Sequence, residues 1–514
     1  MSRRDERGEG RAGARGRRRR YPLIVLGTLL LLVRAAAAFD FDDVSRTAQE
    51  LAATPYEDPR GKVPGWLLEV SYDQWRDIRF RPEFALWRDR KVPFQVQFFH
   101  PGLYYDRPVR MNVIEGDGIR PLAFSPSQFD YGKNDFGSRV PQDLGYAGFR
   151  VHYALKKQDY LDEVIVFLGA TYFRAVGRDE VFGLSARGLA VDTAESRGEE
   201  FPYFREFWMV SPAPNAKEIV IYALLDSARL TGAYRFVVTP GDATVVATDA
   251  KVFLRREVTK LGLAPLTSMF YFGENTVRSF EDFRPEVHDS DGLLLNTRDG
   301  EWLWRPLDNP DTLRVSAFEM KDPIGFGLMQ RDRKFENYQD LETRAEQRPS
   351  TWVEPQGEWG AGRVELIEIP TNADTNDNIV AYWIPAKMPV PGEPLSFSYK
   401  SYWYGDDQRR PPGGRVIATR RDRGTAEGAV RFVVDFAGGK LAKIPADKIV
   451  RGVVTLIGEN PGELIDQHVV KNPTSGGWRL VFQVRPSDES AEMRAFLDLG
   501  GETLTETWSY ANHP

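Results

Sequence analysis

The sequence predicts an all-β protein built from two β-sandwiches, a large N-terminal one and a small C-terminal one. At 514 residues the chain is too long for one ordinary domain. Many short runs of Val, Ile, Phe, Tyr and Trp are interrupted by 45 Gly and 34 Pro, and long helical periodicities are scarce. Loops separate these runs without intervening helical patterns, which favours antiparallel strands over alternating strands and helices.

The first 38 residues predict a secretory signal peptide. Nine arginines within residues 1–20 precede an apolar run from Tyr21 to Val33, and the alanines Ala35–Ala38 provide a cleavage site. The apolar run of thirteen residues is too short to span a bilayer comfortably, which favours cleavage over an uncleaved membrane anchor. The protein would then meet the membrane only through this segment during export, and both the general secretory and the twin-arginine route remain open.

The mature chain, expected to begin near Phe39, is acidic. It holds 58 basic and 71 acidic residues, a net charge of −13. This charge would repel the phosphates of a nucleic acid, so we predict no nucleic-acid partner. The chain has no cysteine, and its five histidines lack the spacing of a metal motif. We therefore predict neither a metal site nor a cofactor.

The chain opens with helical patterns and then becomes rich in strands. The stretch FDFDDVSRTAQELAATPY predicts a short amphipathic helix with Val44, Ala48 and Leu51 on one face, and SYDQWRDIRF predicts a second helix. Strands are predicted in PFQVQFFH, YLDEVIVFLGATYF, EIVIYALL and AYRFVVTPGDATVVATDAKVFL. The last of these is a hairpin that turns at Pro240-Gly241-Asp242.

The second half of the chain contains one more predicted helix and a change of composition. RDRKFENYQDLETRAEQ has helical spacing, and its apolar face comprises Phe335, Tyr338, Leu341 and Ala345. Residues after the tyrosine-rich stretch LSFSYKSYWYG are rich in Asp, Arg, Gly and Pro until alternation resumes in AVRFVVDF. These changes predict a large sandwich over 39–404, a linker or mobile lid over 405–428, and an immunoglobulin-like sandwich over 429–514.

An acidic loop between two strands is the central functional candidate. Residues Val364–Trp383 read VELIEIPTNADTNDNIVAYW, in which two β-prone runs flank a polar crossing that holds Asp374 and Asp377. Tyr382 and Trp383 follow at once. Carboxylates beside aromatic faces suit carbohydrate chemistry, which needs an acid for the glycosidic oxygen and flat apolar surfaces for sugar rings. A surface turn whose Asx side chains bond their own backbone is the alternative.

A second group of carboxylates comprises Asp289, Asp291, Asp299 and Glu301. A calcium loop of EF-hand type that began at Asp289 would need Glu where Gly300 stands, so calcium is excluded on that pattern. Glycoside hydrolysis needs one carboxylic acid to protonate the leaving oxygen and a second carboxylate to activate water or to attack directly. Two acidic loops that face one cleft would meet this need, whereas a turn or salt bridge is the alternative for any single Asp.

Aromatic residues crowd this half of the chain. Most must belong to the sandwich core, and a few are candidate platforms for sugar rings because Trp and Tyr offer broad apolar faces. Signatures of a serine nucleophile elbow, a phosphate loop and a dinucleotide-binding turn are missing from the sequence. The candidate platforms are Trp302, Trp304, Tyr382, Trp383 and Trp403.

Longer motifs resemble one known family. RPEVHDSDGL, GEWLWRPL, RPSTWVEPQGEWGAGRVELIEIPTNADTNDNIVAYW and the terminal ETWSY are similar to the periplasmic glucan biosynthesis proteins G and D, over essentially the whole mature chain. The resemblance implies a large sandwich of the galactose-mutarotase type, an immunoglobulin-like C-terminal domain and a periplasmic location. It also implies osmoregulated periplasmic glucans with β-1,2-linked backbones as the partner, and an inverting endo-β-1,2-glucanase as the activity.

The resemblance implies a role for individual residues. Asp377 of the TNDN motif would be the general acid, and Asp289 of HDSDG would be the base that activates water through a relay. Asp291 is the fallback base and a candidate substrate contact. A non-catalytic glucan-binding or scaffold protein is the alternative from a different functional class, and the sequence also leaves a homodimer open.

One departure from the family pattern bears on the reaction. Where the family commonly has Arg-Tyr-Glu or Arg-Tyr-Asp, this chain has Arg344-Ala345-Glu346. If that tyrosine hydroxyl belongs to the water relay, its loss would slow hydrolysis and favour transfer to a sugar acceptor, which would make the enzyme a transglycosylase or a cyclising enzyme. Alternatively, Ala345 simply continues the apolar face of the predicted helix. We rank hydrolysis ahead.

Overall fold

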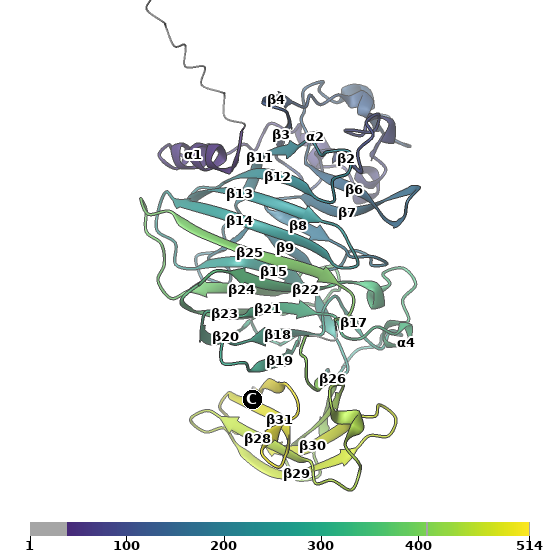
Figure 1. Cartoon of the computed structure of the whole chain (residues 1–514), viewed down its shortest axis with the longest axis vertical. Coiled ribbons are helices and arrows are strands. Elements are labelled where there is room, and N and C mark those ends of the chain that lie inside the picture. Colours follow the sequence, from purple (N-terminus) through teal and green to yellow (C-terminus); the bar gives the residue numbers. More distant parts are fainter. Residues whose placement is uncertain (1–38, 408–409, 513–514) are drawn as a thin grey trace, which may run out of the picture. The chain divides into compact units, whose positions relative to one another are not determined.

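The computed structural model describes residues 39–407 and 410–512, and the predicted signal peptide lies outside this part of the chain. The predicted fold class is confirmed: the described residues form an all-β protein in which stacked sheets make sandwiches (Figure 1). Among these residues, no helix has both the length and the apolar character needed to cross a bilayer.

The helices are short. The predicted N-terminal helix is confirmed as α1, which is capped by the Asp40 carboxylate and buries Val44 and Ala48. The second predicted helix is confirmed only over Tyr72–Arg76, because Arg79–Phe80 at the end of the predicted stretch form a short strand, β1, that pairs with Phe129–Asp130. The α-helices are α1 (Phe41–Ala52), α2 (Gly65–Leu68), α3 (Tyr72–Arg76) and α4 (Phe335–Tyr338).

A ten-stranded sheet forms one layer of the large sandwich. Its strands run in the order β2-β6-β7-β8-β9-β15-β24-β23-β20, and β10 pairs with β15. All of these neighbours are antiparallel. The strands are β2 (Phe94–Phe99), β6 (Gly148–Lys157), β7 (Tyr160–Leu168), β8 (Tyr172–Ala175), β9 (Ser185–Arg187), β10 (Leu189–Val191), β15 (Leu261–Ser268), β20 (Arg314–Lys321), β23 (Ala361–Glu368) and β24 (Ile379–Pro385).

A fifteen-stranded sheet forms the opposing layer and continues into the C-terminal part of the chain. Its order is β28-β31-β33-β19-β18-β21-β22-β25-β14-β13-β12-β11-β3-β4, with β32 on β31. The strands are β3 (Arg110–Glu115), β4 (Gly118–Pro121), β11 (Tyr203–Val210), β12 (Ile219–Asp226), β13 (Leu230–Thr239), β14 (Thr244–Leu254), β18 (Gly292–Asn296), β19 (Trp302–Pro306), β21 (Gly325–Met329), β22 (Ser350–Gln356), β25 (Leu395–Tyr404), β28 (Arg451–Ile457), β31 (Ala491–Leu499), β32 (Glu502–Thr503) and β33 (Thr507–Asn512).

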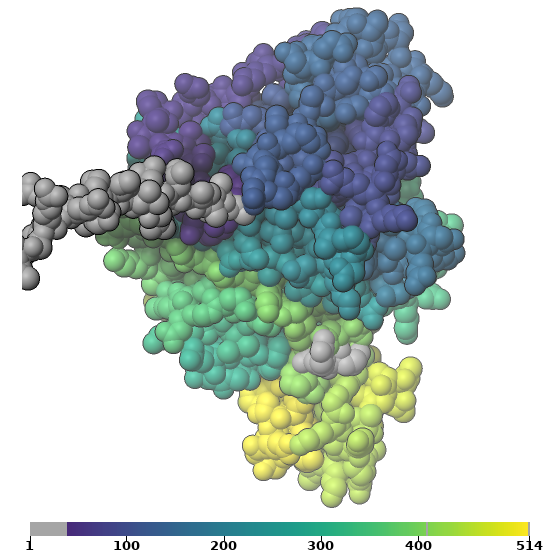
Figure 2. Space-filling model, turned by 45° about the horizontal axis from the view of Figure 1, so that its top comes forward, coloured from purple at the N-terminus to yellow at the C-terminus, as the bar shows by residue number. Residues whose placement is uncertain are grey.

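The join between the large and small sandwiches is a strand pair. β19 and β33 are parallel neighbours, with Leu303 opposite Thr507 and Trp304 opposite Trp508. The last strand of the chain therefore extends the sheet of the large sandwich. Figure 2 shows the surface of the molecule. Its purple and blue residues include the loop-rich segments around β3 and β5 (Phe129–Asp130).

Aromatic side chains fill the core between the two large sheets. Phe167 of β7 lies 5.2 Å from Phe236 of β13, measured between ring centroids, and Phe173 lies 6.2 Å from Trp403. These contacts join the ten-stranded sheet to the fifteen-stranded sheet. Their burial provides the main driving force for stacking the layers.

The small sandwich packs a separate four-stranded sheet against β28, β31 and β33, around Phe432, Phe482, Trp508 and Tyr510. One of its strands, β26, lies inside the stretch predicted as a linker or lid. Val416 and Ala418 of that strand are buried, whereas Arg420 and Arg423 are exposed and Arg415 and Arg421 are half-buried, so the charged composition concealed a strand. The sheet comprises β26 (Arg415–Arg423), β27 (Val430–Ala437), β30 (Trp478–Arg485) and β29 (Glu463–Lys471).

The helix predicted over 331–347 is wrong in its length. Only α4 forms, because Gln339 and Arg344 adopt left-handed backbone angles with φ of 54° and 50°. Leu341, expected on the apolar face, is 82% exposed. Tyr338 and Ala345 are buried as expected, but they reach the interior from separate turns.

Candidate functional site

The predicted strand, acidic loop and strand are confirmed as β23, the loop 369–378 and β24. The side chain of Asn378 holds the loop at its end: it accepts a hydrogen bond from the Phe270 amide at 2.8 Å and donates to the Phe270 and Ile369 carbonyls, each at 3.0 Å. Arg284 binds Asp374 at 2.8 Å. Asp377 therefore projects from a fixed loop, and its side chain is exposed.

Asp289 approaches the same backbone segment from another loop. It follows β17 (Val287–His288), which pairs with β16 (Phe270–Phe272), and the Asp289 amide donates to the Met269 carbonyl at 2.8 Å. Asn378, the neighbour of Asp377, binds the next residue along. The two aspartates thus flank one short strand, with Asp289 largely buried at 7% exposure.

Arg348 connects the two acidic loops. Its guanidinium forms an ion pair with Asp289. Burial and the nearby Arg174 lower the pKa of Arg348 to about 10, and the carboxylates of Asp374 and Asp377 oppose this shift. The charges of Asp289 and Asp377 therefore act on a single buried cation.

Asp291 has a different environment from Asp289. Its carboxylate accepts hydrogen bonds from the backbone amides of Arg331 and Asp332, the second at 3.1 Å, and lies 3.6 Å from the His288 ring. It also lines a small cavity of about 30 Å³ with His288 and Asp332. Asp291 thereby fixes the turn that carries Asp289.

Both ring nitrogens of His288 face oxygen atoms. Its Nε2 lies 3.0 Å from the Glu286 carboxylate and its Nδ1 lies 3.1 Å from Oε1 of Gln330. The Gln330 amide nitrogen donates to the carbonyls of His288 and Ala345, so Oε1 accepts from Nδ1–H, while the Glu286 carboxylate stabilises a proton on Nε2. Burial would lower the pKa of His288, but the Asp291 and Glu286 carboxylates outweigh it and raise the pKa.

Two further acids complete this buried cluster. Burial, with Glu286 and Asp291 nearby, raises the pKa of Glu274 to about 8 and also raises that of Asp332, which donates a hydrogen bond to Glu286. Shared protons account for the close approach of these carboxylates. In the part of the chain described, possible ligand atoms lie within 4.8 Å of one another in two overlapping groups, Glu286, His288 and Asp291, and Glu274, Glu286 and Asp332.

Comparison with known proteins identifies the family of the chain. The family model described as "Periplasmic glucan biosynthesis protein, MdoG" matches residues 39–512. The chain belongs to the MdoG family. The Glucans biosynthesis protein G of Ralstonia nicotianae is 49% identical over 503 residues, which cover 96% of this chain and 99% of that protein. The resemblance inferred from the motifs is confirmed, and the family is one of periplasmic glucan biosynthesis.

Three aromatic residues expected to contact sugar are core residues in this MdoG-family structure. Tyr382, Trp383 and Trp403 are each 0% exposed, so their rings offer no face to a ligand. Tyr382 instead donates a hydrogen bond to Glu365 at 3.0 Å, and Trp403 packs between the sheets. Tyr382 and Trp383 point to opposite faces of β24, and both faces of this strand are covered, whereas Trp403 of β25 points into the main core.

The other two aromatic candidates lie on β19. Trp302 is half-buried and stacks on Trp352 with 5.5 Å between ring centroids. Trp304 is buried, and the Arg331 guanidinium lies 3.5 Å above its ring. Trp304 lines the same small cavity as Asp291, so this ring packs behind the site.

The four acidic residues predicted as one set around Asp289 lie in two separate places in the MdoG-family fold. Asp289 and Asp291 precede β18, whereas Asp299 and Glu301 follow it, at the other end of the strand. Glu301 accepts a hydrogen bond from Thr507 at 2.8 Å and therefore binds the C-terminal strand. Asp299 is exposed.

Sequence reasoning did not identify Arg348, Glu274 or Asp332. Arg348 lies 59 positions from its partner Asp289, and neither residue belongs to a motif that pairs them. The available signal was the large number of charged residues in stretches whose alternation of apolar and polar residues otherwise predicts strands. Such a signal indicates that charges will be buried but does not indicate their partners.

Proposed function

We propose that this exported MdoG-family protein is a glucan-processing enzyme that cleaves β-1,2-glucan with inversion, as an endo-β-1,2-glucanase. The observation that carries the proposal is the cation Arg348, which pairs with the largely buried Asp289 of one acidic loop and feels the charge of the exposed Asp377 of the other. Inverting glycoside hydrolysis requires two carboxyl groups with unequal environments. The family's place in periplasmic glucan biosynthesis supports a glucan substrate.

The exposed Asp377 is suited to reach the substrate. In the proposed reaction its carboxylic acid protonates the glycosidic oxygen of the scissile bond, and the bond to the anomeric carbon then breaks. Asp289 takes a proton from the water that attacks this carbon from the opposite face. The burial of Asp289 supports transfer through an intervening group or water rather than direct contact.

Replacing either aspartate tests the proposal. Asp377→Asn and Asp289→Asn are each expected to lower the rate on linear β-1,2-glucan by about 100-fold or more, because each removes a proton-transfer step. Thin-layer chromatography would measure products, and NMR of fresh products would show the α-anomer that inversion requires. The exposed Asp299→Asn serves as the control.

Full activity in both folded variants would contradict the assigned roles. Slower migration of the wild-type protein in a native gel that contains the glucan, without new products, would instead support the non-catalytic binding or scaffold protein.

Transfer to a sugar acceptor is the second candidate, and Ala345 favours it. This residue is buried beside the His288 network, where its methyl group supplies no hydroxyl to a proton relay. A slower water step would let an acceptor sugar compete. Cyclic glucans or new linkages among the products would identify a transglycosylase, whereas only shorter linear chains would identify a hydrolase.

A further inference from the structure

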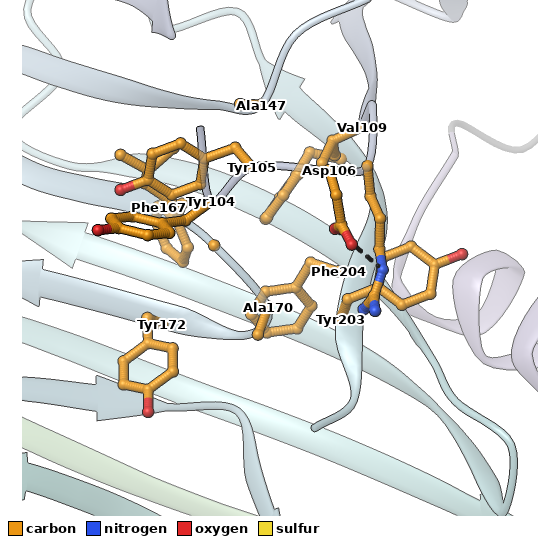
Figure 3. A pocket seen from close by; sticks show the side chains of 14 residues that line it. Tyr104, Tyr105, Asp106, Val109, Ala147, Phe167, Ala170, Tyr172, Tyr203 and Phe204 are labelled. Atoms are coloured by element: carbon orange, nitrogen blue, oxygen red, sulfur yellow. Dashed lines mark ion pairs between the residues drawn. The ribbon is translucent and has the colours of Figure 1, made fainter. Parts of the chain in front are cut away.

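A tyrosine-rich pocket lies beside the candidate catalytic loops, in the large sandwich. Figure 3 shows it between the segment that precedes β3, the end of β7, the start of β8 and the start of β11. The space that it encloses is small, about 50 Å³, and part of the pocket is open to solvent. Its aromatic residues are Tyr104, Tyr105, Phe167, Tyr172, Tyr203 and Phe204.

The inner rings of this pocket are held in place. Tyr105 packs against Trp75 with 4.9 Å between ring centroids. It also lies over Gly169, where an added Cβ would be 3.2 Å from the Tyr105 ring and where φ is +78°. Both conditions favour glycine at this position. The ring of Tyr105 therefore forms a fixed wall of the pocket.

Tyr104 differs from its neighbour because it is exposed. Its side chain is 80% exposed at the mouth of the pocket. In Figure 3 the Tyr104 and Tyr105 rings lie on the same side of the pocket. An aromatic ring that stands open beside a fixed ring offers an apolar face without the cost of unpacking the core.

Polar groups complete the opposite side. Asp106 and Arg107 form an ion pair at 3.3 Å, drawn in Figure 3 beside Tyr203, and the Arg107 guanidinium lies 5.4 Å from the Tyr203 ring centroid. A carboxylate accepts hydrogen bonds and a guanidinium donates them. Apolar faces opposed to such groups match a sugar ring, which has apolar C–H faces and hydroxyls around its edge.

The pocket wall continues toward the two catalytic candidates. Tyr172 lines the pocket at the start of β8; its pKa is raised by burial, and the Asp377 carboxylate contributes to the rise. Arg174, two residues further along β8, acts on the charge of Arg348, the partner of Asp289. One short strand thus borders both the pocket and the charged site.

We propose that this pocket is a remote sugar subsite, which binds a glucose unit of the β-1,2-glucan chain away from the bond that is cleaved. The inference rests on the proposed function for the identity of the glucan. In the bound chain, the C–H face of one glucose ring lies against Tyr104 and Tyr105, and its hydroxyls bond to Asp106 and Arg107.

Tyr104→Ala tests the subsite with little risk to folding, because the side chain is exposed. Affinity for long linear β-1,2-glucan would be measured by calorimetry on the mature chain in an Asp377→Asn background, so that the glucan is not consumed. Loss of the ring is expected to weaken binding by about three- to tenfold. Short oligosaccharides of the same linkage, which cannot extend from Asp377 to the pocket, should show a smaller loss. The matched control is Tyr160→Ala, an exposed tyrosine at the start of β7 outside the pocket.

The outcomes separate the subsite from the proposed reaction. Binding that depends on Tyr104 but not on Tyr160 supports the subsite, even if the wild-type protein releases no products and the proposed enzyme activity fails. Long glucan that binds the Tyr104→Ala variant as tightly as its parent overturns the subsite, even if cleavage by the wild-type protein depends on Asp377.

Discussion

At the scale of single residues, the candidate site depends on one guanidinium, that of Arg348, which interacts with charges of both acidic loops. Arg348 forms an ion pair with Asp289 and feels the charge of Asp377 from the second loop. A planar guanidinium can contact groups on two sides, whereas a lysine ammonium presents a compact charge on a flexible stem. The geometry of the acid pair therefore depends on arginine in particular, not only on a positive charge.

The first prediction follows for Arg348→Lys. If the proposed reaction is correct, this variant should cleave β-1,2-glucan about 10- to 100-fold more slowly, because a small displacement of Asp289 disturbs the attacking water. Initial rates at saturating glucan would measure the effect. Arg344→Lys, an exposed arginine of the same segment, is the control. Equal rates for the two variants would mean that Arg348 only balances charge.

Glu274 gives a second residue-scale prediction, this time for stability. The pKa of its carboxyl is raised from 4.5 to about 8 by burial and by Glu286 and Asp291, although the Thr419 amide and Arg420 oppose the rise. The folded protein therefore binds this proton more tightly than the unfolded chain. As pH rises from about 4.5 to about 8, the folded state loses stability relative to the unfolded state.

Glu274→Gln should remove this loss, because an amide keeps the acceptor for Thr419 but does not ionise. Relative to wild type, the variant should gain of the order of 1–3 kcal/mol in free energy of unfolding at pH 8 compared with pH 5. Urea unfolding followed by tryptophan fluorescence would measure it. The exposed Glu358→Gln is the control. The same pH response in wild type and Glu274→Gln would contradict the assignment.

At the scale of elements, Arg331 and Glu506 connect the turn that carries Asp289 to the C-terminal sandwich. Arg331 donates two hydrogen bonds to the buried Glu506 carboxylate, at 2.6 and 3.0 Å, and one to the Val416 carbonyl at 2.8 Å. Its backbone amide binds Asp291, two residues from Asp289. The small sandwich thus braces the turn that carries the proposed base.

Glu506→Ala should destabilise the protein by about 3–5 kcal/mol, because it leaves the Arg331 charge buried without its partner. Thermal or urea unfolding would measure the change. Glu502→Ala removes an exposed ion pair with Lys440 and should cost less than about 1 kcal/mol. Similar losses from both substitutions would show that the Arg331 contact contributes little to the brace.

Sequence patterns predicted elements better than they predicted their neighbours. The hairpin at Pro240-Gly241-Asp242 and the strands on either side of the Asp377 loop carry their own turn and alternation signals, and both were confirmed. β26 was missed because its four arginines conceal the alternation of its buried residues. The long helix after Arg331 was overpredicted because spacing does not reveal left-handed residues such as Gln339.

Only part of the site could be predicted, again because sequence patterns do not reveal which segments become neighbours. The motifs singled out Asp289 and Asp377, but their approach depends on the pairing of β16 with β17 and on Asn378, which binds Phe270 from 108 positions away. The aromatic candidates Trp383 and Trp403 failed as surface platforms because residue type alone does not distinguish the two faces of a strand.

At the scale of the whole molecule, the two sandwiches share a sheet and a core. Trp304 and Trp352 of the large sandwich belong to the same apolar cluster as Phe432 and Trp508 of the small one. Deleting 411–514 would expose these rings and leave β19 without its neighbour β33. An uncovered strand edge with apolar neighbours promotes association with other chains.

The truncated protein 39–410 is therefore expected to aggregate or to unfold at a lower temperature than the mature chain 39–514. Light scattering after size-exclusion chromatography and a thermal melt would measure both properties, with the mature chain as the control. A monomeric fragment that unfolds at the temperature of the mature chain would show that the large sandwich is independent of the shared sheet.

The parallel pairing of β33 with β19 has a consequence for how the protein is made. β33 is built from Thr507–Asn512, near the very end of the chain, yet its partner was synthesised about two hundred residues earlier. A polypeptide that is still being translocated cannot close this pair, whatever has already collapsed on the far side of the membrane. Until Thr507–Asn512 is made, the sheet therefore keeps an open edge at β19, and a chain that stops before this segment leaves that edge for proteases to recognise.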